Sequence, residues 1–124
     1  MSDIKASFFL ECEELLESLF DALQRLSDDG PDDETINIAF RAVHSIKGGA
    51  SAFALPELVG FAHEFETVMD HLRSRKLTLT DDLGMVLLRS GDILSDLVKA
   101  SRDGSEIDKG QIVPLLDSLA AFTT

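Results

Sequence analysis

The chain of 124 residues is long enough for one domain with its own core, and 44% of it is hydrophobic. Its formal net charge of −12 at pH 7 disfavours binding to nucleic acid or to anionic lipid. One cysteine cannot form an internal disulfide, the first residues lack the pattern of a signal peptide, and no apolar stretch could span a bilayer. We therefore expect a single cytoplasmic domain over residues 1–124, without nucleic acid partners or membrane insertion.

The first helix is predicted from apolar residues that recur every three or four positions through residues 8–26. Cys12 belongs to this apolar pattern, where a lone cysteine usually serves as a small buried group. Residues 27–33 (SDDGPDD) form a turn by composition. Either Asp32 or Asp33 can cap the helix that follows.

Residues 35–56 contain no Asp or Glu, although the chain has 23 of them. Their only Lys and Arg side chains are Arg41 and Lys47, with His44 midway between. At about 100° per residue, His44 lies at the edge of an apolar stripe that comprises Ile36, Ala39, Phe40, Val43, Ile46, Ala50 and Ala54. In so acidic a chain, this is the segment where an anion could bind.

Two consecutive glycines, Gly48 and Gly49, stand inside this helical pattern, and each is unfavourable by about 1 kcal/mol relative to Ala. One interpretation ends the helix at Gly48. The alternative continues the helix, because apolar residues keep the period and the clear stop comes only at Pro56. A continuous helix would leave the surface beside His44 bare, so that a partner could approach the imidazole.

A third helix is predicted from Pro56, which suits a first turn, and its apolar stripe extends through residues 58–72. Glu66 and His63 lie on one edge of this helix. Glu66 thus has the same kind of border position on the third helix as His44 has on the second.

Two more helices follow. One is predicted to begin at Thr80 and to break at residues 101–104. The last is predicted from about Val113, with a start at Asp108 and a kink as the alternative. No strand pattern is present and the connections are short, which favours antiparallel neighbours. We therefore expect an all-α fold: an antiparallel up-down four-helix bundle with a fifth C-terminal helix packed alongside.

Familiar enzyme sites do not fit this sequence. The glycine pair lacks the spacing and preceding strand of a P-loop, and a Ser-His-Asp hydrolase would lack its strand-turn-helix frame. A metal centre of His44, His63 and Glu66 is an alternative. Di-iron bundles, however, use paired Glu-x-x-His motifs with further glutamates, which this chain lacks. We expect no metal and no cofactor bound by the chain.

The chemistry that remains is histidine as a nucleophile. A neutral imidazole with its lone pair on Nε2 can attack a phosphoryl group if Nδ1 keeps its proton. We predict that Glu66 accepts a hydrogen bond from Nδ1 of His44 and that Lys47 attracts the phosphoryl oxygens. A purely structural histidine is the competing interpretation. The acid-free surroundings and the glycine pair argue against it.

The motif HSIKGGA at residues 44–50, followed by His63-x-x-Glu66, resembles the histidine phosphotransfer (HPt) domain family, and most closely the P1 phosphoacceptor domains of the chemotaxis histidine kinase CheA. The likeness is specific over about residues 40–70, and the five-helix layout extends it to nearly the whole chain. It implies that His44 is phosphorylated and that Lys47, His63 and Glu66 form a hydrogen-bonding network around it.

A docking surface beside His44 is also expected, with Arg41, Gly48, Gly49 and Ser51 as its residues. Ser51 departs from the glycine of many relatives, and residues 54–56 also differ from common versions. These differences could change how partners dock.

The resemblance implies a phosphocarrier of two-component signalling. The ATP-binding domain of a histidine kinase, absent from this chain, would supply the phosphoryl group with its own ATP and Mg²⁺. The phosphohistidine would then pass it to an aspartate of a response-regulator receiver domain. The chain would be part of a longer kinase, or a free-standing phosphorelay protein loaded from a phosphorylated receiver. A helical adaptor without phosphotransfer is the third reading.

Overall fold

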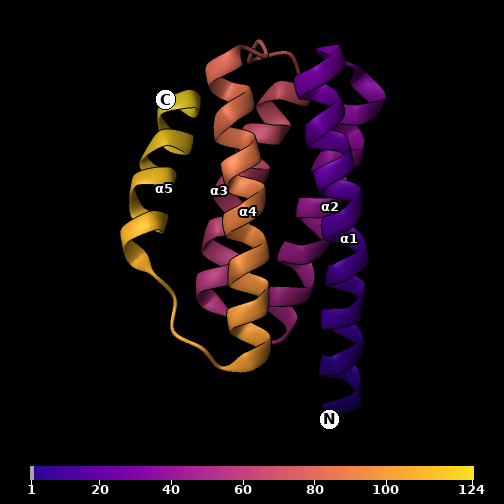
Figure 1. Cartoon of the computed structure of the whole chain (residues 1–124), viewed down its shortest axis with the longest axis vertical. Coiled ribbons are helices and arrows are strands. Elements are labelled where there is room, and N and C mark those ends of the chain that lie inside the picture. The colour runs from indigo at the N-terminus through magenta and orange to yellow at the C-terminus, as the bar shows by residue number, and fades with distance from the viewer. Residues whose placement is uncertain (1) are drawn as a thin grey trace.

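The computed structural model describes residues 2–124, which are almost entirely helical (Figure 1). The helices are α1 (Ser2–Asp29), α2 (Asp33–Ala52), α3 (Pro56–Arg73), α4 (Asp81–Asp103) and α5 (Lys109–Thr123). No strand occurs within residues 2–124. The predicted all-α class is confirmed.

The first four helices form a closed bundle. Helix α1 packs against α2 and α4, and α3 packs against α2 and α4. Helix α5 lies outside this ring, against α3 and α4, after an extended connection (Figure 1). Successive helices run in opposite directions, as short connections require. The predicted up-down bundle with a fifth helix alongside is therefore confirmed.

One hydrophobic core joins all five helices. Each helix contributes side chains with no solvent exposure, among them Leu19, Ile46, Phe65, Leu94 and Leu119. Burial of such side chains contributes roughly 1.5–3 kcal/mol each to folding. The apolar stripes read from the sequence are thus the faces that meet in the core.

Side-chain caps begin three of the helices. Asp32 caps α2 by accepting hydrogen bonds from the hydroxyl and the main-chain N–H of Thr35, at 2.7 and 2.9 Å, and these bonds lower the pKa of Asp32. Thr80 caps α4, as predicted. Asp108 caps α5, which therefore begins at Lys109 with Pro114 inside it. The start at about Val113 was wrong and the alternative start at Asp108 is confirmed, because the cap satisfies a main-chain donor one turn earlier.

Helix α2 continues through both glycines, which confirms the alternative of a continuous helix over an end at Gly48, but it ends at Ala52 rather than near Pro56. The main-chain N–H of Phe53 donates to the carbonyl of Gly49 at 3.1 Å and closes the last turn. Ala54 then takes a left-handed conformation with φ 54° and is exposed, so its place in the core stripe was wrong. The residue before a proline disfavours helix, which accounts for a turn ahead of Pro56.

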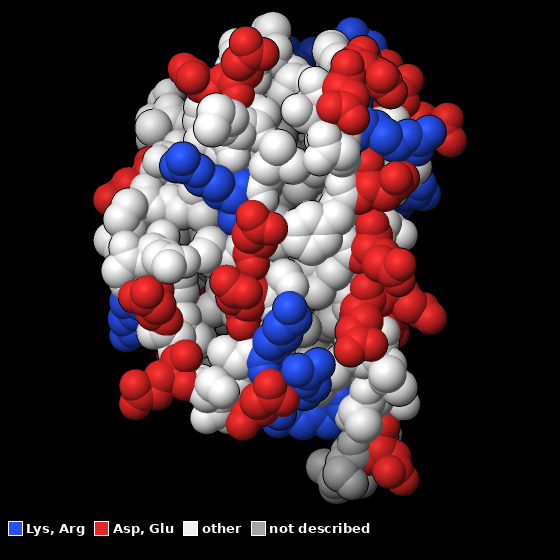
Figure 2. All heavy atoms as spheres, viewed as in Figure 1, with Lys and Arg blue, Asp and Glu red and all other residues white. Residues whose placement is uncertain are grey.

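Acidic side chains line the exposed face of α1. In Figure 2 acidic side chains run along the outer face of α1, where Glu11, Glu13, Glu14 and Glu17 are all exposed. None of the helices in the described part of the chain has both the length and the apolar character needed to span a membrane.

Candidate functional site

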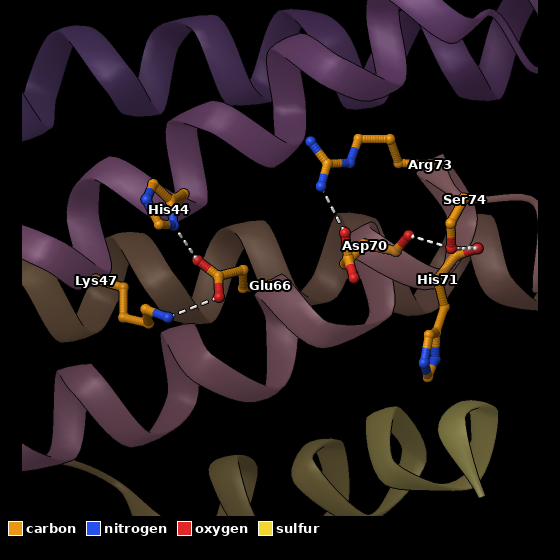
Figure 3. A network of polar contacts seen from close by, with 7 residues as sticks. All are labelled: His44, Lys47, Glu66, Asp70, His71, Arg73 and Ser74. Atoms are coloured by element: carbon orange, nitrogen blue, oxygen red, sulfur yellow. Dashed lines mark hydrogen bonds and ion pairs between the residues drawn. The ribbon is translucent and has the colours of Figure 1, made fainter.

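His44 lies at the edge of the bundle, on the side of α2 that faces α3. Its side chain is 61% exposed, while its Nδ1 lies 2.5 Å from Oε2 of Glu66 on α3 (Figure 3). A carboxylate oxygen only accepts hydrogen bonds, so this contact places the ring proton on Nδ1 and leaves the lone pair on Nε2. The edge position and the Glu66 partner are where the sequence placed them.

The second oxygen of the Glu66 carboxylate contacts Lys47. Oε1 lies 2.6 Å from Nζ of Lys47, which is one helical turn after His44 on α2 (Figure 3). The Glu66 and Lys47 side chains are only 14% and 24% exposed. Glu66 therefore links two residues of α2 from the neighbouring helix.

The charge of Glu66 depends on these two partners. Burial raises the pKa of the carboxyl group, but the hydrogen bonds from Lys47 and from His44 outweigh burial and hold that pKa below its usual value. Glu66 is consequently ionised at neutral pH. An ionised acceptor at Nδ1 both fixes the tautomer and stabilises positive charge on the ring.

The arrangement can support nucleophilic attack by Nε2 of His44. The Lys47 ammonium group contacts Glu66. That Lys47 attracts phosphoryl oxygens stays a prediction. Within residues 2–124, no group of three or more His, Cys, Asp or Glu side chains is gathered as metal ligands would be.

His63 lies outside this hydrogen-bonded group. It is exposed, one turn before Glu66 on α3, and in residues 2–124 no hydrogen bond joins its ring to His44, Lys47 or Glu66. Its main-chain carbonyl accepts a hydrogen bond from the hydroxyl of Thr67 at 2.9 Å. The four-membered network implied by the resemblance therefore has three members here.

The residues predicted for docking differ in their surroundings. Arg41 and Ser51 are exposed, and a Cβ atom added at Gly48 would meet nothing within 4 Å. A Cβ atom at Gly49 would instead lie well inside van der Waals contact with the ring of Phe8 on α1. The close packing of α1 on α2 therefore explains why residue 49 is a glycine. Docking at Arg41, Gly48 and Ser51 stays a prediction.

Sequence reasoning missed the contact of Phe40 with His44 and that of Arg73 with Phe40. Phe40, placed on the core stripe, is only half-buried, and its ring stacks against the imidazole. The guanidinium group of Arg73, near the end of α3, lies over the Phe40 ring. The spacing of Phe40 four residues before His44 was the available indication, since residues so spaced are neighbours on a helix.

Comparison with known proteins identifies related domains. The family described as Hpt domain matches residues 3–112. The chain is 50% identical over 122 residues to the chemotaxis protein CheA of Rhizobium meliloti (strain 1021), covering 98% of this chain and 16% of that protein. It is also 50% identical over 125 residues to the chemotaxis protein CheA of Cereibacter sphaeroides, covering 96% of this chain and 18% of that protein.

A solved structure agrees in fold. The solution structure of the histidine phosphotransfer domain of CheA has a TM-score of 0.84 to this chain at 29% sequence identity, covering 98% of this chain and 92% of that one. The two CheA relatives are far longer, and the chain spans only 16% and 18% of their lengths.

Proposed function

The chain belongs to the Hpt domain family, and from that premise we propose that His44 is the residue that accepts and passes on a phosphoryl group in chemotaxis signalling. One observation carries the proposal: an exposed imidazole whose Nδ1 lies 2.5 Å from a largely buried carboxylate. In the neutral imidazole, that combination places the proton on Nδ1 and leaves an accessible lone pair on Nε2.

In the first step, the Nε2 lone pair of His44 attacks the γ-phosphorus of ATP held by a histidine kinase domain. A nitrogen–phosphorus bond forms as the bond from phosphorus to the β–γ bridging oxygen breaks, and ADP leaves with that electron pair. Nδ1 keeps its proton throughout. Glu66 stabilises the positive charge that develops on the ring, because it accepts a hydrogen bond from that proton.

In the second step, a carboxylate oxygen of a receiver aspartate attacks the phosphorus. The nitrogen–phosphorus bond breaks, its electron pair returns to Nε2, and the neutral imidazole is regenerated with the proton still on Nδ1. The chain needs no cofactor of its own in this scheme. ATP and Mg²⁺ are bound by the partner domains, and this domain contributes the orientation of the ring.

The partners we propose are therefore the ATP-binding domain of a histidine kinase and response-regulator receiver domains. Since both work where ATP is available, we place the chain in the cytoplasm. The net charge of −12 supports protein partners over nucleic acid, whose phosphates it would repel.

The direct test compares two histidine variants, His44→Gln and His71→Gln. His71 is the matched control because its ring points away from the His44 group (Figure 3). Each protein would be incubated with radiolabelled ATP and the ATP-binding part of the Rhizobium meliloti relative. We expect acid-labile labelling of the wild type and of His71→Gln, and none of His44→Gln. Labelling retained in His44→Gln would overturn the proposal.

The phosphoryl donor distinguishes a kinase domain from an independent relay protein. The same proteins would be offered a phosphorylated receiver domain in place of ATP and kinase. Faster loading from the kinase supports the chemotaxis role. Loading from the receiver alone would instead indicate a free-standing relay intermediate.

A further inference from the structure

Phe40 contacts the reactive ring directly. It lies one helical turn before His44 on α2, and the two ring centroids are 5.8 Å apart with planes inclined by only 13°. Phe40 is half-buried and packs against the hydrophobic core, whereas the His44 side chain is mostly exposed. A fixed aromatic surface thus lies alongside a ring that has few other neighbours.

The Phe40 ring is in turn held from α3. The guanidinium carbon of Arg73 lies 3.8 Å from the centroid of the Phe40 ring, within the range of a cation–π contact. Asp70, one turn earlier on α3, accepts a hydrogen bond from Nη2 of Arg73 at 2.7 Å (Figure 3). Asp70, Arg73 and Phe40 therefore form a connected row that ends on the imidazole.

A single hydrogen bond does not fix an imidazole ring. The contact between Nδ1 and Glu66 restrains one atom, but a coupled rotation about χ1 and χ2 of His44 can still tilt the ring while this hydrogen bond is kept. Such a rotation leaves the tautomer unchanged and moves the Nε2 lone pair to a new direction. A flat neighbour parallel to the ring restricts this rotation, because tilting the ring brings its edge against the aromatic face.

We infer that Phe40 is a positioning residue that fixes the plane of the His44 ring, and that Arg73 holds Phe40 in place for this task. Glu66 then selects the nitrogen that reacts, and Phe40 sets the direction in which its lone pair points. The placement of the ring is a property of the unphosphorylated protein. Its kinetic consequence rests on the proposed function.

The first test measures the ring in the absence of any partner. Phe40→Leu keeps an apolar side chain but loses the flat face, and Phe40→Tyr keeps the face as the matched control. The readout is the NMR order parameter of the His44 ring C–H bonds, with the ¹⁵N shifts reporting the tautomer. We expect a lower order parameter in Phe40→Leu, the wild-type value in Phe40→Tyr, and the same Nδ1–H tautomer in both.

The second test measures phosphorylation by the kinase part of the Rhizobium meliloti relative. Because misplacement of reacting groups lowers the rate rather than the affinity, we expect kcat to fall about 10-fold in Phe40→Leu with KM nearly unchanged. Phe40→Tyr should restore kcat to within about 2-fold of the wild type. A variant that merely weakened docking would raise KM instead.

A surface variant covers the case in which Phe40→Leu fails to fold. Arg73→Gln removes the cation over Phe40 at an exposed position, and it should lower the His44 order parameter by a smaller amount. An unchanged order parameter in the folded variants would overturn the placement. A lowered order parameter with unchanged kcat would overturn the link to the reaction. If the wild type itself is not labelled, the proposed function fails while the NMR result still decides the placement.

Discussion

Two side chains of this bundle that carry nucleophilic atoms, the imidazole of His44 and the thiol of Cys12, lie in opposite surroundings. His44 stands at the α2–α3 edge with its side chain in solvent, whereas Cys12 lies in α1 with 0% exposure. Burial raises the pKa of the Cys12 thiol to about 12, and the nearby charge of Glu11 adds to that effect. The thiol is therefore kept protonated and unreactive.

A glutamate acts on each nucleophile, with opposite results. Glu11 disfavours the thiolate of Cys12 through charge repulsion. Glu66 accepts a hydrogen bond from Nδ1 of His44, and so leaves free Nε2, the nitrogen that we propose reacts. Burial is the larger cause of the suppression of Cys12, and the two glutamates differ because Glu11 acts on the sulfur itself whereas Glu66 contacts Nδ1 and not Nε2.

The largest predicted effect concerns Cys12. Since its pKa rises from 9.0 to about 12, the thiolate fraction at neutral pH falls about 1000-fold, a factor of ten for each pKa unit. We expect alkylation by iodoacetamide to be at least about 1000-fold slower in the folded protein than in urea, as followed by mass spectrometry. Comparable rates in the two states would remove the contrast with His44.

The contrast was only partly predictable from the sequence. Helical periodicity placed Cys12 in the core and His44 at an edge, because spacing determines which face of a helix a residue occupies. The partnership of His44 with Glu66 was predicted from matching border positions on adjacent antiparallel helices. Lys47 was placed one turn from His44 by its spacing, whereas a hydrogen-bonding network that joins it to Glu66 was expected only from the family resemblance.

Contacts between helices set the limit of that prediction. Periodicity on one helix cannot show that Gly49 meets Phe8, because the close approach depends on how α1 crosses α2. The same holds for Arg73, which reaches Phe40 from another helix. Phe40 was assigned to the core because an edge position differs from a buried one by only a few tens of degrees on the wheel.

The second prediction removes the charge beside His44. Glu66→Gln keeps the shape of the side chain but loses the negative charge that we propose stabilises the His44 ring during the reaction. We expect phosphorylation to slow roughly 10–100-fold, a common cost of losing a charged partner of a reactive histidine. The rate of labelling from ATP would be measured beside that of Glu64→Gln on the same helix. Unchanged kinetics with a normal circular dichroism spectrum would refute this role.

The third prediction compares Gly48 and Gly49, which are neighbours in sequence but lie on different sides of α2. Gly49→Ala should destabilise the fold by about 1–2 kcal/mol, because crowding against Phe8 exceeds the gain of about 1 kcal/mol in helix propensity. Gly48→Ala meets open space and should stabilise it by up to about 1 kcal/mol. Urea unfolding gives both values. Equal effects of the same sign would show that the two positions are not distinguished by packing on α1.

The smallest predicted effect is the pH dependence of the Glu66 contacts. The pKa of Glu66 in the folded protein lies below its usual value of 4.5, so near that pH the unfolded chain binds more protons than the folded one. The hydrogen bonds from Lys47 and His44 should therefore stabilise the protein fully above about pH 4.5 and less as the pH falls through the pKa of Glu66 in the folded protein.

Free energies of unfolding would be measured for the wild type and Glu66→Gln between about pH 6 and about pH 3.5. The other acidic groups are common to both proteins, so the difference reports the Glu66 carboxylate together with its contacts to Lys47 and His44. We expect the advantage of the wild type to shrink toward acid by at most about 1 kcal/mol, the usual range for a partly exposed ion pair. An advantage that stayed constant or grew toward acid would mean that Lys47 and His44 do not stabilise the ionised carboxylate. The contact with Glu66 would then no longer explain why the lone pair of His44 lies on Nε2.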